Sequence, residues 1–362
     1  MPRPPREDPE RIRVVHVLNE LHPSGMERML VAAGRHFRDL GIVSSVIGQG
    51  ASHPYAAALE AAGYEVMLAP VRSSDGGKTM ANMIQVVHPD VVHLHSEKDY
   101  LRTVLTARRA APRAALVRSI HSVFAATGAW RWRRTAQAVI ADRMVAALVS
   151  CGPAVEENER RFFRYAPTIL NWVDDRFLSI ESDTEPTNNP IAVIVGNCSA
   201  IKNHEMALNA LLHSHVAVVH IGDERGATPK ELALLEALGD RGLLIDRGVK
   251  DPASWLARAQ GFFLPSTNEG FSIALAEAVV VGIPALVSDL PGIQWAAEFG
   301  VERVPLSDEE WRSATDRWRS ATQHSRWASA NDEAKKKLSA SRGAGEYAKL
   351  YRRLVSKRTT GA

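Results

Sequence analysis

Two glutamates and a short run of backbone N–H groups could bind one ligand that carries both anionic and hydroxyl groups. Gly270 lets the backbone approach a ligand closely, and the N–H groups of Gly270, Phe271 and Ser272 at a helix start offer a site for an anion such as phosphate. Glu269 lies in the loop before that site, and Glu277 is expected about two turns inside the helix. Since carboxylates repel phosphate, we expect Glu269 and Glu277 to accept hydrogen bonds from hydroxyl groups of the ligand. A ligand with hydroxyl groups on either side of a phosphate group is typically a nucleotide-sugar.

The elements around these residues follow from the local pattern. The block 261–266 is apolar and closed by turn residues, which predicts a buried parallel strand. Helix formers follow from about Ser272, and Gly282 with Pro284 predicts the helix end. The loop that carries Glu269 therefore leads from a strand into a helix.

This segment resembles a known signature. Glu269 and Glu277 have seven residues between them, Gly-Phe follows the first, and residues 282–284 are Gly-Ile-Pro. The pattern is similar to the E-x7-E signature of glycosyltransferase family 4, retaining enzymes of the GT-B fold. The resemblance implies an α/β fold of two Rossmann-like domains with parallel sheets facing a central cleft. It implies transfer of a sugar, with retention, from a UDP- or GDP-linked donor to an acceptor hydroxyl.

Length and composition limit the classes of protein to which the chain can belong. The chain has 362 residues, enough for two domains, and 45% hydrophobic with 23% charged residues is typical of a globular protein. A formal net charge of +3 is small for this length, so we expect no nucleic acid as a partner. The sequence has no apolar run of transmembrane length, which leaves only peripheral contact with a membrane open. Cys151 and Cys198 lie far apart, so we expect reduced thiols and a cytoplasmic location.

Short apolar blocks alternate with amphipathic segments, which predicts βαβ units. We expect a disordered tail at 1–10, an N-terminal Rossmann-like acceptor domain at 11–180, a polar linker at 181–190 and a C-terminal nucleotide-sugar domain at 191–340. The first domain's strands are predicted at 12–18, 42–47, 65–69, 91–94, 115–120, 145–149 and 168–170, and the second's at 191–195, 216–221, 243–245, 262–264 and 285–287. The family resemblance implies that the amphipathic helix at 341–362 crosses back to the first domain.

Gly25 follows the first predicted strand and resembles the second glycine of the family's G-G-x-E loop, which lies beside the donor diphosphate. Ser24 replaces the first glycine and leaves less room for a phosphate. The alternative is an ordinary helix start, with Glu27 favoured by the helix dipole.

Three histidines stand at the ends of predicted strands. His121 follows the strand 115–120 at the edge where parallel sheets carry ligands, and it resembles the family histidine that reaches the donor sugar. The alternative is a structural histidine. His93 and His95 share one face of a strand, which fits either a metal pair or two hydrogen-bonded structural side chains.

The second domain opens with a sequence similar to the family's phosphate-binding segment. Lys202 falls on the lysine position, whereas Asn197 replaces an arginine and so removes a bidentate cation. Either Lys202 with the helix N-terminus suffices, or Arg225 compensates; the alternative for Lys202 is a solvated lysine. At the domain crossover, Trp172 stands where the family has glycine, and Asn171 precedes it.

The resemblance assigns catalytic roles to His121, Lys202 and Glu269. It assigns donor binding to a larger set, namely Gly25, Lys202, Glu269, Gly270, Phe271, Ser272 and Glu277. Residues 246–248 would face the base. The sequence has no Asp-x-Asp, G-x-G-x-x-G or P-loop, so we expect no metal, no cofactor and no nicotinamide or kinase chemistry.

Two other functions share this pattern. One is a nucleotide-sugar 2-epimerase, which needs no acceptor. The other is a non-catalytic nucleotide-sugar-binding protein, favoured by the departures at Ser24 and Asn197. The acceptor, whether a glycan, a lipid or a small natural product, depends on loops that sequence alone does not decode.

Overall fold

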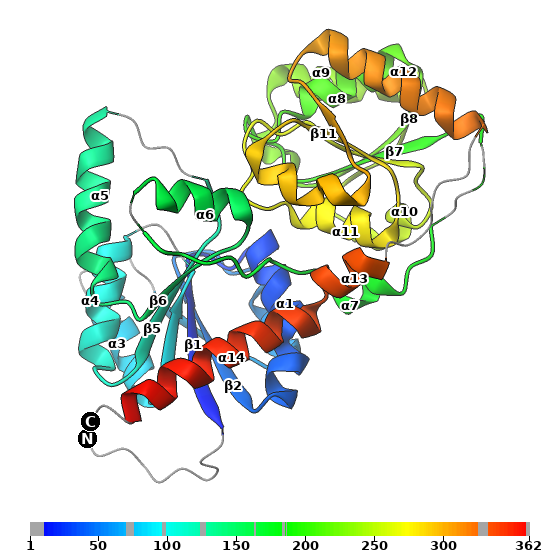
Figure 1. Cartoon of the computed structure of the whole chain (residues 1–362). Coiled ribbons are helices and arrows are strands. Elements are labelled where there is room, and N and C mark those ends of the chain that lie inside the picture. Colours follow the sequence, from blue (N-terminus) through cyan, green and yellow to red (C-terminus); the bar gives the residue numbers. More distant parts are fainter. Residues whose placement is uncertain are drawn as a thin grey trace. The chain divides into compact units, whose positions relative to one another are not determined.

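The computed structural model describes residues 11–69, 76–95, 99–123, 128–162, 164–182, 185, 187–324 and 332–359. The chain forms two compact units (Figure 1): unit 1 runs to Asp174 and resumes at Ala340, and unit 2 is Asp175–Ser339. The predicted tail at 1–10 lies outside the described residues. No helix in the described part of the chain combines the length and the apolar sequence of a transmembrane span.

Unit 1 contains a six-stranded sheet in the order β3-β2-β1-β4-β5-β6, and its paired strands are parallel. The strands are β1 (Ile12–Leu18), β2 (Ile42–Gln49), β3 (Glu65–Ala69), β4 (Val91–Leu94), β5 (Ala115–Ile120) and β6 (Ala147–Ser150). The helices are α1 (Gly25–Asp39), α2 (Ala56–Ala61), α3 (Gly76–Val87), α4 (Tyr100–Ala110), α5 (Gly128–Asp142), α6 (Pro153–Arg160) and α14 (Ala340–Thr359).

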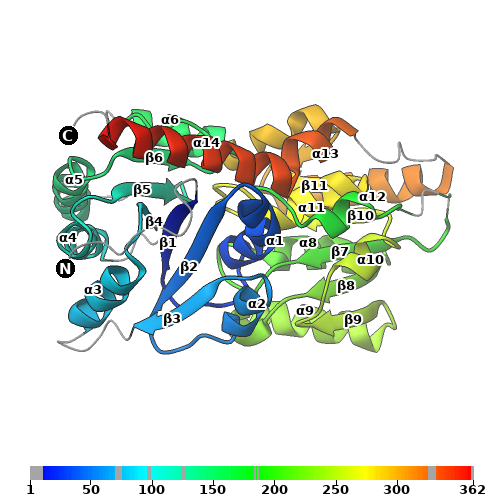
Figure 2. The same cartoon turned by 90° about the horizontal axis from the view of Figure 1, so that it is seen from below.

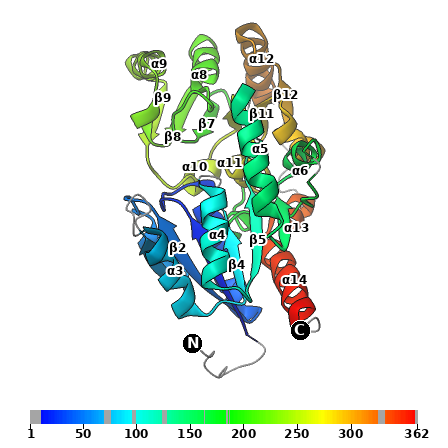
Figure 3. The ribbon, with the colours of Figure 1, turned by 90° about the vertical axis from the view of Figure 1, so that its left-hand side faces the viewer.

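Helices cover both faces of this sheet, which is why most residues of its strands are apolar. One core layer joins β1 and β2 to α1, α2 and α14 (Figure 2). The opposite layer joins the sheet to α3, α4 and α5 (Figure 3). The unit is therefore a doubly wound α/β sandwich.

Unit 2 repeats this architecture with the strand order β12-β11-β10-β7-β8-β9, and its paired strands are parallel. The strands are β7 (Ile191–Val195), β8 (Ala217–Ile221), β9 (Leu244–Gly248), β10 (Gly261–Leu264), β11 (Ala285–Ser288) and β12 (Glu302–Val304). The helices are α7 (Asp175–Leu178), α8 (His204–His213), α9 (Pro229–Asp240), α10 (Ala253–Leu256), α11 (Ile273–Val281), α12 (Asp308–His324) and α13 (Asp332–Leu338), with 3-10 turns η1 (Glu224–Gly226) and η2 (Pro291–Phe299).

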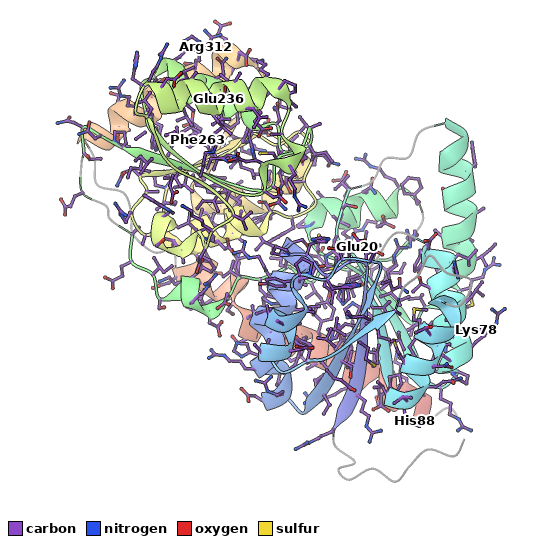
Figure 4. All side chains as sticks on the ribbon, turned by 180° about the vertical axis from the view of Figure 1, so that it is seen from behind. Glu20, Lys78, His88, Glu236, Phe263 and Arg312 are labelled. Carbon is purple, nitrogen blue, oxygen red and sulfur yellow. The ribbon has the colours of Figure 1, made fainter. Side chains whose placement is uncertain are left out.

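The core of unit 2 lies between its sheet and the helices α8, α9 and α12. Figure 4 shows the pattern in three side chains: Phe263 on β10 lies inside this layer, whereas Glu236 and Arg312 lie on the outer surfaces of α9 and α12. The helices α10 and α11 lie on the other side of the sheet. Two Rossmann-like units with parallel sheets confirm the predicted fold class.

The division between the units falls just before α7, upstream of the predicted linker at 181–190, because α7 packs on α11. At the other end of unit 2, the chain returns to unit 1 through α14. This helix packs on α1 and contributes Tyr347 and Tyr351 to the core of unit 1.

One predicted strand was wrong, and one observed strand was not predicted. Residues 168–170 form no strand, because only Thr168 makes a ladder bridge, to Ser150. The strand β12 was missed, since it has three residues and two of them, Glu302 and Arg303, are charged. An edge strand this short and this charged has too few apolar residues to be predicted from the sequence.

Candidate functional site

The predicted phosphate-binding segment lies at the start of α11 in unit 2. Ser272 is the N-cap, and its hydroxyl accepts a hydrogen bond of 3.3 Å from the Leu275 N–H. Gly270 and Phe271 therefore directly precede the helix, as predicted. Because α11 begins at Ile273, Glu277 lies just over one turn inside the helix, and the predicted depth of two turns was wrong.

Lys202 and Glu269 form an ion pair beside this helix start. The Lys202 ammonium lies 2.7 Å from Glu269 Oε1, and the two side chains are 26% and 9% exposed. The Ser266 hydroxyl donates a second hydrogen bond, of 2.8 Å, to the same oxygen. The structure thus brings together two residues that the sequence assigned to one site from positions 67 apart.

Backbone contacts fix the two loops that carry this pair. The Thr267 N–H donates to the Ile201 carbonyl at 2.8 Å, and the Asn203 side chain donates to the Pro265 carbonyl at 3.1 Å. Asn203 has φ of 50°, in the left-handed region, where asparagine is tolerated, and it occupies the N-cap position of α8 without a side-chain capping bond. Sequence reasoning did not identify these contacts, although Asn203 follows Lys202 directly.

Glycine is required at position 292 because of the same loop. A Cβ at Gly292 would lie 1.8 Å from the Glu269 carbonyl oxygen. Nearby, the rings of Phe271 and Trp295 stack with centroids 4.4 Å apart. The segment after β11 therefore supports the loop that holds Glu269, and only Gly292 after Pro291 could have signalled it in the sequence.

Glu277 is 2% exposed and is the single charged residue of α11. The rest of that helix is Ile, Ala, Leu and Val. A carboxylate is costly to bury among such residues, so its presence indicates a specific role for Glu277. Its predicted contact with ribose hydroxyls stays a prediction.

Asn197, which replaces the family arginine, connects two loops. Its side-chain oxygen accepts a 3.0 Å hydrogen bond from the Asp223 N–H. Arg225, the candidate compensating cation, is 85% exposed and forms an ion pair with Asp223. In this structure the charge of Arg225 is therefore balanced by a neighbouring carboxylate.

The predicted base-contacting residues lie at the end of β9. Asp246 accepts a 3.0 Å hydrogen bond from the Trp255 indole, and Arg247 lies 3.2 Å from Glu224. Their contact with a base stays a prediction.

In unit 1, Gly25 is the first residue of α1 and Ser24 is the N-cap. The Ser24 hydroxyl donates to the Glu27 carboxylate. Glu27 is buried, and this burial raises its pKa. The glycine therefore lies at a helix start, which both interpretations of this segment require.

His121 ends a chain of imidazoles that starts inside the sheet. Its Nε2 lies 3.3 Å from His95 Nδ1, and His95 Nε2 lies 3.0 Å from His16 Nδ1. Burial lowers the pKa of His16 to about 3 and that of His95 well below its ordinary value. His121 is thus placed at the carboxyl end of β5, as predicted, and is oriented by a neutral partner.

His93 and His95 share a face, with ring centroids 4.0 Å apart, as the strand period predicts. However, His93 uses both ring nitrogens for hydrogen bonds, one of 2.6 Å to Tyr351 and one of 2.8 Å to Ser119. The structure therefore favours the structural interpretation of His93 over the metal pair.

Trp172 fills the core of unit 1. Its indole N–H donates to the Met29 carbonyl at 2.9 Å, and a Cβ at Gly343 would lie 2.0 Å from the indole. The departure from the family glycine is thus compensated by a glycine on α14. Asn171 is buried, and its carbonyl accepts a 3.3 Å hydrogen bond from Arg342.

Comparison with known families decides the class of protein. Residues 23–177 match the model of Glycosyltransferase Family 4, and residues 175–336 match that of Glycosyl transferases group 1. The chain therefore belongs to the glycosyltransferases that these two models describe. The boundary of the two matches coincides with the boundary of the two units.

Individual relatives of this glycosyltransferase are distant. A D-inositol 3-phosphate glycosyltransferase of Xylanimonas cellulosilytica is 28% identical over 118 residues, which cover 30% of this chain and 28% of the relative's length. HepE of Anabaena, solved with UDP and glucose, superposes with a TM-score of 0.72 at 16% identity, covering 94% of this chain and 99% of that one. Sucrose-phosphate synthase of Thermosynechococcus elongatus gives 0.71 at 13% identity, covering 96% and 100%. The glycosyltransferase therefore has the GT-B fold of these structures.

Proposed function

We propose that this glycosyltransferase transfers a sugar, with retention of anomeric configuration, from a nucleoside diphosphate sugar to an acceptor hydroxyl. The observation that carries the proposal is the Lys202–Glu269 ion pair at the start of α11. It places a cation, a carboxylate and the N–H groups of a helix start within one loop system, which suits a diphosphate linked to a sugar.

The ammonium of Lys202 has three N–H donors, of which one is directed to Glu269. The remaining donors suit the phosphate oxygens of the leaving group. Charge on the diphosphate grows as its bond to the sugar breaks, so a fixed cation stabilises the transition state more than the bound donor. This assigns leaving-group stabilisation to Lys202 and the helix start, with no metal ion at the diphosphate.

The reaction itself needs no protein nucleophile in this proposal. The bond between the anomeric carbon and the diphosphate oxygen breaks, and the acceptor oxygen bonds to that carbon on the same face. The acceptor proton passes to a phosphate oxygen of the departing diphosphate. Glu269 and His121 would bind the sugar, Glu277 the ribose, and Gly25 would leave room for the diphosphate.

UDP-glucose is the first donor to test, because HepE was solved with UDP and glucose. Inositol 3-phosphate belongs in the acceptor panel because the distant relative is named a D-inositol 3-phosphate glycosyltransferase. We infer a cytoplasmic reaction, since the chain has two cysteines in 362 residues and both are buried.

The test incubates the protein with UDP- and GDP-sugars, with and without the acceptor panel, and analyses the products by NMR. Release of nucleoside diphosphate with an acceptor-linked sugar of unchanged anomeric configuration supports the proposal. An inverted product contradicts retention. An epimerised nucleotide-sugar formed without acceptor identifies a 2-epimerase, and binding without any turnover identifies a non-catalytic binding protein.

A further inference from the structure

Four buried side chains in unit 2 converge behind the loop that carries Lys202. They are Cys198 after β7, His204 at the start of α8, His220 on β8 and Glu231 on α9. One ligand-type atom of each lies within 4.8 Å of every other. Their spacing in the sequence is irregular, so the cluster does not correspond to a recognisable sequence motif.

We propose that Cys198, His204, His220 and Glu231 bind one Zn²⁺ ion as a closed, structural site. Thiolate, imidazole and carboxylate are the ligands that zinc takes in proteins, and four protein ligands leave no position for a substrate. The site is distinct from the donor site and concerns a different cation from the Mg²⁺ or Mn²⁺ of metal-dependent sugar transfer.

The distances fit a tetrahedral ion. For Zn–S of about 2.3 Å and Zn–N of about 2.0–2.1 Å, tetrahedral geometry separates sulfur from nitrogen by about 3.6 Å and nitrogen from nitrogen by about 3.4 Å. Cys198 Sγ lies 3.6 Å from His220 Nε2 and 3.9 Å from His204 Nδ1, and the two nitrogens are 3.1 Å apart. Glu231 Oε1 completes the set at 2.9 Å from His204 Nδ1.

The charges also fit. A Zn²⁺ ion bound by one thiolate, one carboxylate and two neutral imidazoles has a net charge of zero, which lowers the cost of burying the ion. Glu231 Oε1 is buried and accepts no hydrogen bond with proper geometry from the residues described, despite its short distance from His204. A cation between these atoms would give this buried oxygen a partner.

The surroundings hold the ligands in place. Glu231 uses its other oxygen in the capping box with Thr228, which leaves Oε1 directed to the cluster. His220 Nδ1, the nitrogen not directed to the cluster, lies 3.5 Å from Glu224, in the manner of carboxylate–histidine–zinc arrangements. A Cβ at Gly226 would lie 2.3 Å from the Cys198 carbonyl, so this glycine permits the close approach of the loops.

Bound zinc would stabilise the segment between Cys198 and His204, which contains Lys202. This consequence for turnover rests on the proposed function, whereas zinc binding itself does not. The test therefore reads metal content first.

The experiment measures zinc in the purified full-length chain by mass spectrometry and then exchanges it for Co²⁺. We expect one zinc per chain and a thiolate-to-cobalt charge-transfer band. Cys198→Ser should remove the band, and Glu231→Gln, which keeps the capping box, should weaken zinc binding by at least about 10-fold. Removal of zinc should lower the Tm by about 5 °C or more.

Cys151→Ser is the matched control, because Cys151 is the other buried cysteine and lies in unit 1. It should retain one zinc and the cobalt band. Wild-type protein that takes up neither metal after reconstitution would overturn the proposal, as would equal zinc affinity in Glu231→Gln and wild type. The wild-type stoichiometry decides the question even where a ligand variant fails to fold.

Discussion

Replacing Lys202 with alanine tests the chemical role of the ion pair. Lys202 Nζ lies 2.7 Å from Glu269, but the lysine side chain is 26% exposed. Solvent screening therefore limits its contribution to folding to about 1 kcal/mol. Its contribution to leaving-group stabilisation should be larger, about 2.7–4 kcal/mol by analogy with an oxyanion-hole donor, or about 10² to 10³ in turnover.

The assay compares kcat, the donor Kd and the Tm of Lys202→Ala with those of wild type. We expect a large loss of kcat, a smaller loss of donor affinity and a small shift in Tm. Lys230→Ala is the matched control, because Lys230 pairs with Glu205 in the same unit but is 66% exposed. Its kinetics should be unchanged.

A near-normal kcat in Lys202→Ala would refute the assignment and make Lys202 a surface lysine. Asn197→Arg adds information, because it restores the family cation. The change also removes the hydrogen bond from Asp223 to Asn197, so a rise in turnover would show that the missing charge limits the enzyme.

Three further predictions follow from the structure. Donor turnover should survive EDTA; a loss that Mg²⁺ or Mn²⁺ restores would contradict the metal-free donor site, whereas a loss that only Zn²⁺ restores reports on the proposed zinc site. Gly292→Ala should lower kcat and Tm, because the added Cβ would meet a carbonyl at 1.8 Å, whereas Gly239→Ala on α9, with no atom within 4 Å, should be neutral or stabilising. Gly343→Ala should destabilise the protein by about 1–3 kcal/mol in urea unfolding through overlap with the Trp172 indole, whereas Gly345→Ala on the same helix should stabilise it by about 0.5–1 kcal/mol. Equal effects within either pair would show that the glycine's surroundings do not matter.

The strands of both sheets could be predicted because parallel strands that are buried on both faces consist of short blocks of mainly apolar residues. Most predicted strands start or end within two residues of those observed. The exceptions are β12, whose charged residues hide it, and 168–170, where pairing stops after one bridge. Local apolar content can be recognised in the sequence, whereas the pairing of strands that are distant in sequence cannot.

The positions of the candidate site residues could be predicted where they belong to a local sequence motif. Glu269, Ser272 and Lys202 lie where the family pattern implied, at strand ends and helix starts of unit 2. Contacts between distant segments were not predictable, as the compensation of Trp172 by Gly343 shows. Such pairs depend on the register of helices that local periodicity does not set.

The central claim is that unit 2 binds a nucleoside diphosphate sugar, with Glu277 on the ribose and Glu269 on the sugar. Calorimetric titration with UDP and with GDP tests it, using wild type, Glu277→Ala and Glu269→Ala. Loss of hydrogen bonds to a charged group costs roughly 1.5–3 kcal/mol, so Glu277→Ala should weaken nucleoside diphosphate binding by about 10- to 150-fold. Glu269→Ala should leave that affinity unchanged or raise it, since Glu269 competes with the diphosphate for Lys202, while depressing turnover.

Glu277→Gln, which keeps the side-chain volume in the buried helix, separates loss of the carboxylate from loss of packing and should also weaken binding. If Glu269→Ala loses diphosphate affinity and both Glu277 variants keep it, the two roles are reversed. If wild type binds neither UDP nor GDP, or if no variant changes the affinity, the donor site is not at the start of α11 and the account is wrong.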